Sequence, residues 1–225
     1  PLLAVLLACV GCMILGMTIE KIAYKPLRGA SPLAVLITAI GVSYLLQSLA
    51  QIIFGSAPKM VTVYEFGAVQ FMGANVQISA LVTLAVATVV MAALTLFVKY
   101  TRLGRAMIAV SEDRGAAQLM GINVNKTISV TFAIGSALAA IAGVLLCSSY
   151  PILVPTTGSM PGIKAFTAAV FGGIGSIPGA FIGGILLGLI ETFTKAYITT
   201  NLSDAVVFAV LIIVLLVKPA GLLGK

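Results

Sequence analysis

Long apolar runs alternate with short polar segments along this chain. Four of them, residues 2–19, 33–54, 78–98 and 128–147, are about as long as a membrane span, and a fifth, 205–217, is shorter. An α-helix needs about 20 mostly apolar residues to cross a hydrocarbon layer about 30 Å thick. The pattern therefore predicts an all-α fold, a polytopic transmembrane helical bundle.

The stretch between the fourth and the last run, residues 163–200, is too long for one span. At 1.5 Å per residue it would make a helix of about 57 Å, nearly twice the thickness of the hydrocarbon layer. Residues 172–179 within it read Gly-Gly-Ile-Gly-Ser-Ile-Pro-Gly, and such a run breaks a helix. We expect a half-length, re-entrant helix, a Gly-rich turn and then a full span over about 178–196.

Basic residues favour one side of this arrangement. If segments 20–32, 99–127 and 218–225 are cytoplasmic, the other side keeps Lys59, Lys164 and Lys195 alone. The cytoplasmic segments then hold Lys21, Lys25, Arg28, Lys99, Arg102, Arg105, Arg114, Lys126, Lys218 and Lys225. This distribution follows the positive-inside rule only if 163–200 is broken as described.

Composition narrows the class further. Only 8% of the residues are charged against 60% hydrophobic, whereas a soluble domain averages about 25% charged residues. The net charge of +7 is spread between apolar runs rather than gathered on one face, so no nucleic-acid binding is expected. The chain has no His, and its three Cys lie apart in apolar runs, so we expect no metal site and no disulfide framework.

The most polar segment, residues 99–127, contains a short predicted helix. Ser111 is placed to cap it, and Glu112 lies near the positive end of its dipole. We expect the helix to run from about 112 to 120 and to end at Gly121, a residue that readily adopts the left-handed conformation.

This short helix has a small apolar face, formed by Ala116, Ala117, Leu119 and Met120. One interpretation is an ordinary cytoplasmic connector. The other is a docking helix that inserts into a groove on a soluble partner.

Several motifs resemble the permease subunits of branched-chain amino acid ABC importers. The pattern Ala116-Ala117-x-x-x-Gly121 is similar to the Glu-Ala-Ala-x-x-x-Gly core of ABC importer permeases, with Gly115 where the family has Glu or Ala. The entry Pro26-Leu-Arg-Gly29 followed by 36–41 is similar to the H-type subunit. Further similar segments are 105–113, 121–124, 132–143, 161–166, 171–180 and 218–225.

The resemblance implies a single transmembrane permease domain over 1–225, with 99–127 as its cytoplasmic coupling loop, in the bacterial inner membrane. It implies that Glu112, Ala116, Ala117 and Gly121 couple the permease to two ATP-binding cassette subunits. It also implies a second permease subunit, either an M-type homologue or a second copy, and a periplasmic or lipid-anchored substrate-binding protein. Because family members begin with further spans, we expect spans ahead of residue 1.

Two sets of residues are candidates for the translocation path. Ser43, Gln47 and Gln51 form an i, i+4, i+8 stripe, and polar groups in lipid either bond a neighbouring helix or line a path. The second set is Gly172, Gly173 and Gly175, since broken helices in transporters commonly lie at the binding region. Nearer the span ends, Glu191 and Lys195 are expected to form an ion pair and Asp204 to cap the last span.

Other function classes fit less well. A secondary transporter or channel often carries charged residues near the centre of a span, and the predicted spans carry none there. A membrane enzyme needs a polar constellation, which six scattered carboxylates without His do not form. No Gly-x-x-x-x-Gly-Lys-Ser/Thr loop is present, so we expect no catalytic residues and no cofactor here, with ATP bound by the partner subunit.

The predicted sidedness can be tested by thiol labelling. In a background without native Cys, cysteines placed at Arg28, Arg105 and Lys225 should resist membrane-impermeant thiol reagents in intact cells, because all three lie in predicted cytoplasmic segments. Permeabilised cells serve as the labelling control. Labelling of the Lys225 site alone would mean that 163–200 crosses once.

Overall fold

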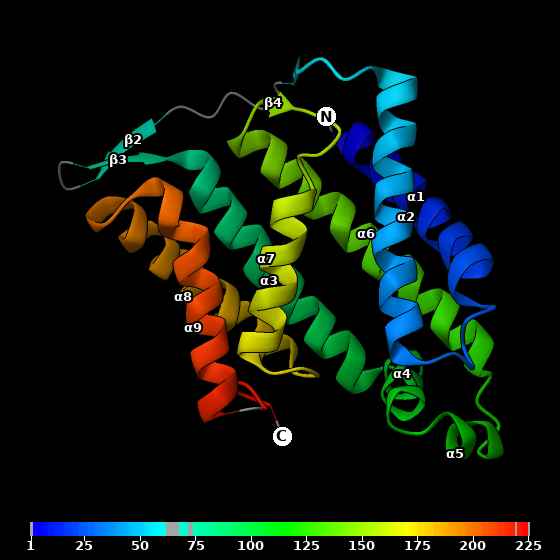
Figure 1. Cartoon of the computed structure of the whole chain (residues 1–225). Helices are drawn as coiled ribbons and strands as arrows, with labels where there is room; N and C mark the ends of the chain where they lie inside the picture. The colour runs from blue at the N-terminus through cyan, green and yellow to red at the C-terminus, as the bar shows by residue number, and fades with distance from the viewer. Residues whose placement is uncertain (1, 62–67, 72–73, 219, 225) are drawn as a thin grey trace. The chain divides into compact units, whose positions relative to one another are not determined.

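The computed structural model describes residues 2–61, 68–71, 74–218 and 220–224. The chain divides into two compact units (Figure 1). The first contains Pro1–Ala87 and Leu96–Thr156, and the second contains Thr88–Thr95 and Thr157–Lys225.

Helices dominate the first unit. It contains α1 (Leu2–Ile19), the π-helix η1 (Glu20–Tyr24), α2 (Pro32–Phe54), most of α3 (Ile78–Tyr100), α4 (Arg102–Glu112), α5 (Arg114–Leu119) and α6 (Val124–Ser149). Helix α1 packs along α6, and Gly16 is buried at their contact, where a Cβ would overlap the Ser136 side chain. The small residue lets the two backbones approach closely, which substitutes for hydrophobic driving force between helices in lipid.

Short antiparallel pairs connect the helices. Strand β1 (Lys59–Met60) pairs with β4 (Ile152–Leu153), and β2 (Ala68–Phe71) pairs with β3 (Ala74–Gln77). The first pair ties the segment after α2 to the segment after α6. The sequence pattern did not indicate these strands.

The polar segment between α3 and α6 contains two helices where one was predicted. Helix α4 occupies Arg102–Glu112, and α5 begins at Arg114, so the expected start of the short helix at Glu112 is wrong. The cap is Asp113, whose Oδ1 accepts from the N–H groups of Gly115 (2.7 Å) and Ala116 (3.0 Å). Ser111 instead donates to the Ile108 carbonyl within α4 (2.7 Å).

The second unit contains α7 (Ser159–Gly172), α8 (Ile177–Tyr197), the 3-10 turn η2 (Thr200–Leu202) and α9 (Ser203–Val217). The break predicted within 163–200 is confirmed, and it lies between Gly172 and Ile177. Gly173 and Gly175 there have φ of 111° and 93°, a region that favours glycine. Phe171, Leu187 and Val207, one from each helix, form the core of this unit.

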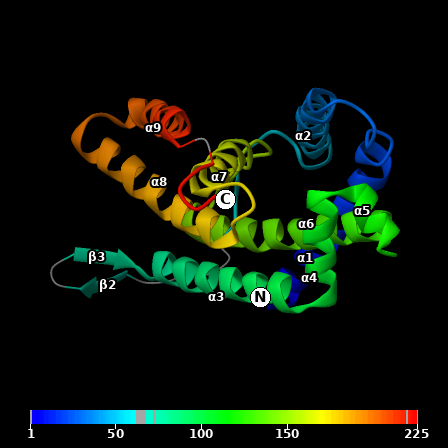
Figure 2. The ribbon, with the colours of Figure 1, turned by 90° about the horizontal axis from the view of Figure 1, so that it is seen from below.

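The C-terminal segment covers the break between α7 and α8 (Figure 2). The N–H groups of Leu222 and Leu223 donate to the carbonyls of Phe171 (3.0 Å) and Gly172 (2.9 Å). The last carbonyls of α7 have no donor within the helix, and these two N–H groups supply one. Hydrocarbon could not supply such donors.

In the described part of the chain, six helices are long and apolar enough to cross a membrane. They are Leu3–Tyr24, Leu33–Phe54, Ile78–Tyr100, Val124–Ser149, Ile177–Tyr197 and Thr200–Val217. The predicted fold class is confirmed, and each predicted apolar run coincides with one helix.

The close packing at the break predicts a strong effect of Gly172→Val. A Cβ at Gly172 would overlap the Gly179 backbone, and overpacking of this kind costs about 1–3 kcal/mol. We expect a clear fall in the thermal stability of the detergent-purified protein. Size-exclusion chromatography after heating measures it. Gly41→Val is the control, because Gly41 lies exposed on α2 with nothing within 4 Å of its Cβ position. Equal stability of the two variants would contradict this account of the break.

Candidate functional site

Helix α5 presents part of the predicted docking face to solvent and buries the rest. Ala117 is only 3% exposed, whereas Leu119 and Met120 are 91% and 82% exposed. The expected single apolar face is therefore split. A partner can contact Leu119 and Met120, while Ala117 packs α5 onto its own chain.

The remaining predicted coupling residues lie before, within and after this helix. Ala116 lies exposed in the first turn of α5, and Gly121 follows the helix with φ of 80°. The N–H of Ile122 then donates to the Ala117 carbonyl (3.0 Å), a helix-closing bond of the kind that a left-handed glycine permits. Glu112 is exposed at the end of α4 and is not part of α5.

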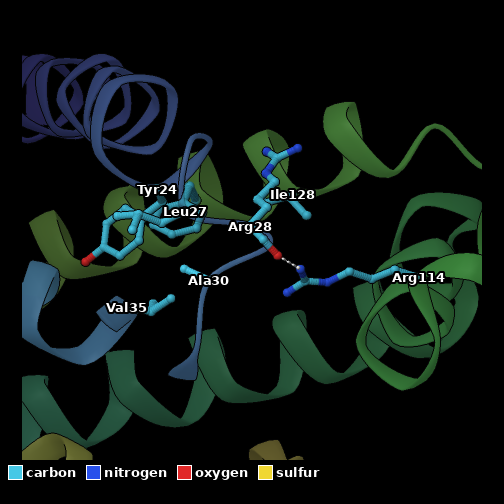
Figure 3. Close-up of a pocket in the computed structure, with 8 residues that line it drawn as sticks. Tyr24, Leu27, Arg28, Ala30, Val35, Arg114 and Ile128 are labelled. Carbon is cyan, nitrogen blue, oxygen red and sulfur yellow. Dashed lines mark hydrogen bonds between the residues drawn. The ribbon is translucent and has the colours of Figure 1, made fainter. Parts of the chain in front are cut away.

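Arg114, the first residue of α5, joins this helix to the connector between η1 and α2. Its Nη1 donates to the backbone carbonyl of Arg28 (3.2 Å) (Figure 3). The side chain of Arg28 forms an ion pair with Glu20 and donates to Asn125 Oδ1 on α6. Segments 20–32 and 99–127, which the charge bias assigned to one side of the membrane, therefore lie side by side.

Glu20 is the buried centre of this junction. Its side chain is 2% exposed, and its two carboxylate oxygens accept from Arg28 and from the Ser129 hydroxyl (2.7 Å). Burying a carboxylate is costly unless it is paired and hydrogen-bonded. The Glu20 junction, defined as Glu20, Arg28, Asn125 and Ser129, links the end of α1 to the first turns of α6.

Of these four residues, only Arg28 was part of a sequence-based prediction, as one of the basic residues that mark the cytoplasmic side. One signal was available: Glu20 directly follows the apolar run 2–19 and Arg28 is eight residues further on. A carboxylate so close to hydrocarbon requires a cationic partner. The spacing to Asn125 and Ser129 could not be inferred, because it depends on the packing of α1 against α6.

The polar stripe on α2 is present as predicted. Gln47 Nε2 donates to Ser43 Oγ (3.2 Å), while Ser43 and Gln51 are exposed. Gln47 itself is half-buried. Its use as a translocation path stays a prediction.

The glycine candidates Gly172, Gly173 and Gly175 lie at the break in the second unit. Gly172 and Gly173 are buried and Gly175 is exposed. The buried pair contacts the Gly179 backbone and the 221–224 segment, so the chain itself fills the space beside them. Their role in a path likewise stays a prediction.

A charged cluster joins the three helices of the second unit away from the break. Lys164 Nζ of α7 lies 2.8 Å from Glu191 Oε1 of α8 and 2.7 Å from Asp204 Oδ1 of α9. The predicted Glu191–Lys195 ion pair is confirmed at 2.5 Å. The expected cap at Asp204 is wrong, because α9 begins after Leu202 without a side-chain cap.

Among the described residues, no group of three His, Cys, Asp or Glu side chains could hold a metal ion. Six helices of membrane-spanning length, a break packed by its own chain, and a short helix with an exposed apolar end are the features of a multi-pass helical membrane protein.

Comparisons with known proteins place this membrane protein in a family. Residues 1–215 match the family described as branched-chain amino acid transport system / permease component. The chain is 44% identical to the high-affinity branched-chain amino acid transport system permease protein LivH of Escherichia coli (strain K12), over 93% of this chain and 70% of that relative. It is 43% identical to BraD of Pseudomonas aeruginosa over the same shares.

A more distant relative, a probable LivH of Methanocaldococcus jannaschii, is 30% identical over all of this chain and 73% of that protein. No solved structure matches the chain. The chain belongs to the family of branched-chain amino acid transport permease components, as a multi-pass permease subunit of an importer in the inner membrane.

The burial of Glu20 predicts that Glu20→Ala strongly destabilises the protein. It would leave the Arg28 guanidinium beside α6 without its carboxylate, and breaking a buried pair costs about 3–5 kcal/mol. Thermal unfolding in detergent measures the loss. The double variant Glu20→Ala/Arg28→Ala should lose less than the sum of the single variants. Glu112→Gln is the control, since that exposed residue should change stability by less than about 0.5 kcal/mol.

Proposed function

We propose that this chain forms half of the transmembrane passage of an ABC importer for branched-chain amino acids, driven by ATP that a separate subunit hydrolyses. The observation that carries the proposal is 43–44% identity, across 93% of the chain, to permeases of high-affinity branched-chain amino acid transport systems. Related amino acids, urea and short amides are the alternative cargoes.

The second support is the geometry of α5. A short helix capped by Asp113 presents Leu119 and Met120 to solvent in the segment with the most positive charge. An apolar pair at the end of a rigid helix suits a groove on a soluble protein. We assign that groove to the ATP-binding cassette subunit, with two such subunits serving two permease subunits.

If α5 docks on the ATPase, a movement of α5 must be transmitted to the membrane-spanning helices. Helix α5 holds the 25–31 connector through Arg114, and the Glu20 junction holds that connector to α1 and α6. Because Glu20 and Ser129 are buried or half-buried and hydrogen-bonded, this link is stiffer than an exposed ion pair, which is often worth less than about 1 kcal/mol. Movement of α5 would therefore shift the ends of α1 and α6 together.

The passage itself needs a second permease subunit, an M-type homologue or another copy, and a substrate-binding protein delivers the cargo from outside. The Ser43–Gln47–Gln51 stripe on α2 supplies hydrogen-bonding groups that a zwitterionic amino acid requires in a low-dielectric path. Those groups are exposed or half-exposed in the first unit, as a path shared with a second subunit requires.

The proposal is tested by reconstituting the importer in vesicles and measuring ATP-dependent uptake of labelled leucine. Met120→Asp, directly after α5, should place a charge in the apolar groove and reduce co-purification of the ATPase about tenfold, which corresponds to about 1.4 kcal/mol. Leucine uptake should fall in parallel, while membrane insertion of the permease is unchanged.

Met60→Asp is the matched control, because Met60 is 80% exposed and Met120 is 82% exposed, yet Met60 lies in a segment predicted to be outside. The association of the Met60→Asp protein with the ATPase should equal that of the unsubstituted protein. Full ATPase association of the Met120→Asp protein would refute docking through α5. Absence of ATP-dependent leucine uptake by the unsubstituted importer would refute the assigned cargo.

A further inference from the structure

A cavity of about 420 Å³ is lined by the end of η1, the connector after it, the first turn of α2 and the start of α6 (Figure 3). One part of its wall is apolar and aromatic, formed by Leu27, Val35, Phe132 and the ring of Tyr24. The other part is formed by Arg28 and Arg114. An apolar wall beside guanidinium groups fits a ligand with an apolar tail and an anionic head.

The cavity is lined by residues near the ends of three candidate membrane spans. Tyr24 is the last residue of the span Leu3–Tyr24, and Val35 lies in the first turn of the span Leu33–Phe54. Phe132 lies in the third turn of the span Val124–Ser149. Residues at the ends of three spans face the interface, where Tyr is also enriched.

The basic side of the cavity has hydrogen-bond donors and positive charges that are not used by the described residues. Arg28 is engaged by Glu20 and Asn125, but Arg114 uses one N–H on the Arg28 carbonyl, and a guanidinium has five. Lys21, Lys25 and Lys126 lie exposed on the adjoining segments and form no ion pair with the described residues.

A second cavity of about 700 Å³ adjoins the first and shares Arg28, Arg114 and Ile128 with it. Its wall adds Gln118 of α5 and Asn123 before α6. These side chains are hydrogen-bond donors and acceptors of the kind that bind hydroxyl and phosphate groups.

We propose that these joined cavities bind an anionic phospholipid of the cytoplasmic leaflet, with its phosphate at Arg114 and one acyl chain along Leu27, Val35 and Phe132. Basic pockets between spans on the cytoplasmic side bind anionic headgroups. The apolar wall favours a lipid over a free phosphate ion, because a phosphate ion has no apolar group to pack against this wall. Because the headgroup touches α5 and the 25–31 connector at once, the lipid steadies the docking helix.

The test is native mass spectrometry of the complete importer, with its ATPase bound, in detergent containing phosphatidylglycerol or phosphatidylcholine. Arg114→Gln should lower phosphatidylglycerol retention about fivefold, since each basic residue near an anionic headgroup contributes a factor of this size. Retention of phosphatidylcholine should stay low in both proteins. Arg102→Gln is the matched control, because Arg102 is exposed in the same segment but lines neither cavity. Equal loss in the two variants would overturn the site.

A second pair of variants tests the apolar wall of the cavity. Val35→Trp should fill the cavity and reduce phosphatidylglycerol retention, whereas Leu36→Trp, at the next position and 57% exposed, should not. Displacement of the lipid by millimolar glycerol 3-phosphate would show a phosphate site rather than a lipid site and overturn the proposal. So would retention in the isolated permease that disappears when the ATPase is bound, since the cavities would then belong to the protein interface.

Discussion

Hydrocarbon offers no hydrogen-bond partner to the backbone, and this constraint decides most of the structure. Six helices satisfy it internally. Between α7 and α8, where the described chain leaves helix from Gly173 to Ser176, residues 222 and 223 supply hydrogen-bond donors to the end of α7. A second constraint applies to the Glu20 side chain: burying a carboxylate is costly unless it is paired and hydrogen-bonded, and Arg28 and Ser129 supply these partners.

The features that could be predicted from sequence are those set by local composition. The length of each apolar run placed the spans, and the Gly-Pro content of 172–179 placed the break, because both effects act within a few residues. The start of α5 was misplaced by two residues because Ser111 and Asp113 are both good caps. Only the continuation of α4 to Glu112 decides between them.

Features that depend on distant segments could not be predicted. The Glu20 junction needs α1 packed on α6, and the orientation of Ala117 needs α5 packed on its neighbours. As a result, Ala117 is buried against its own chain, whereas Leu119 and Met120 at the end of α5 are exposed.

The cover over the α7–α8 break also sets an order of events during biosynthesis. The carbonyls of Phe171 and Gly172 receive their donors from Leu222 and Leu223, which leave the ribosome after α8 and α9 have been made. Until these residues have been made, the two carbonyls at the end of α7 lack these donors, and water or another protein must supply them. The second unit can therefore be completed only after both α8 and α9 have been synthesised.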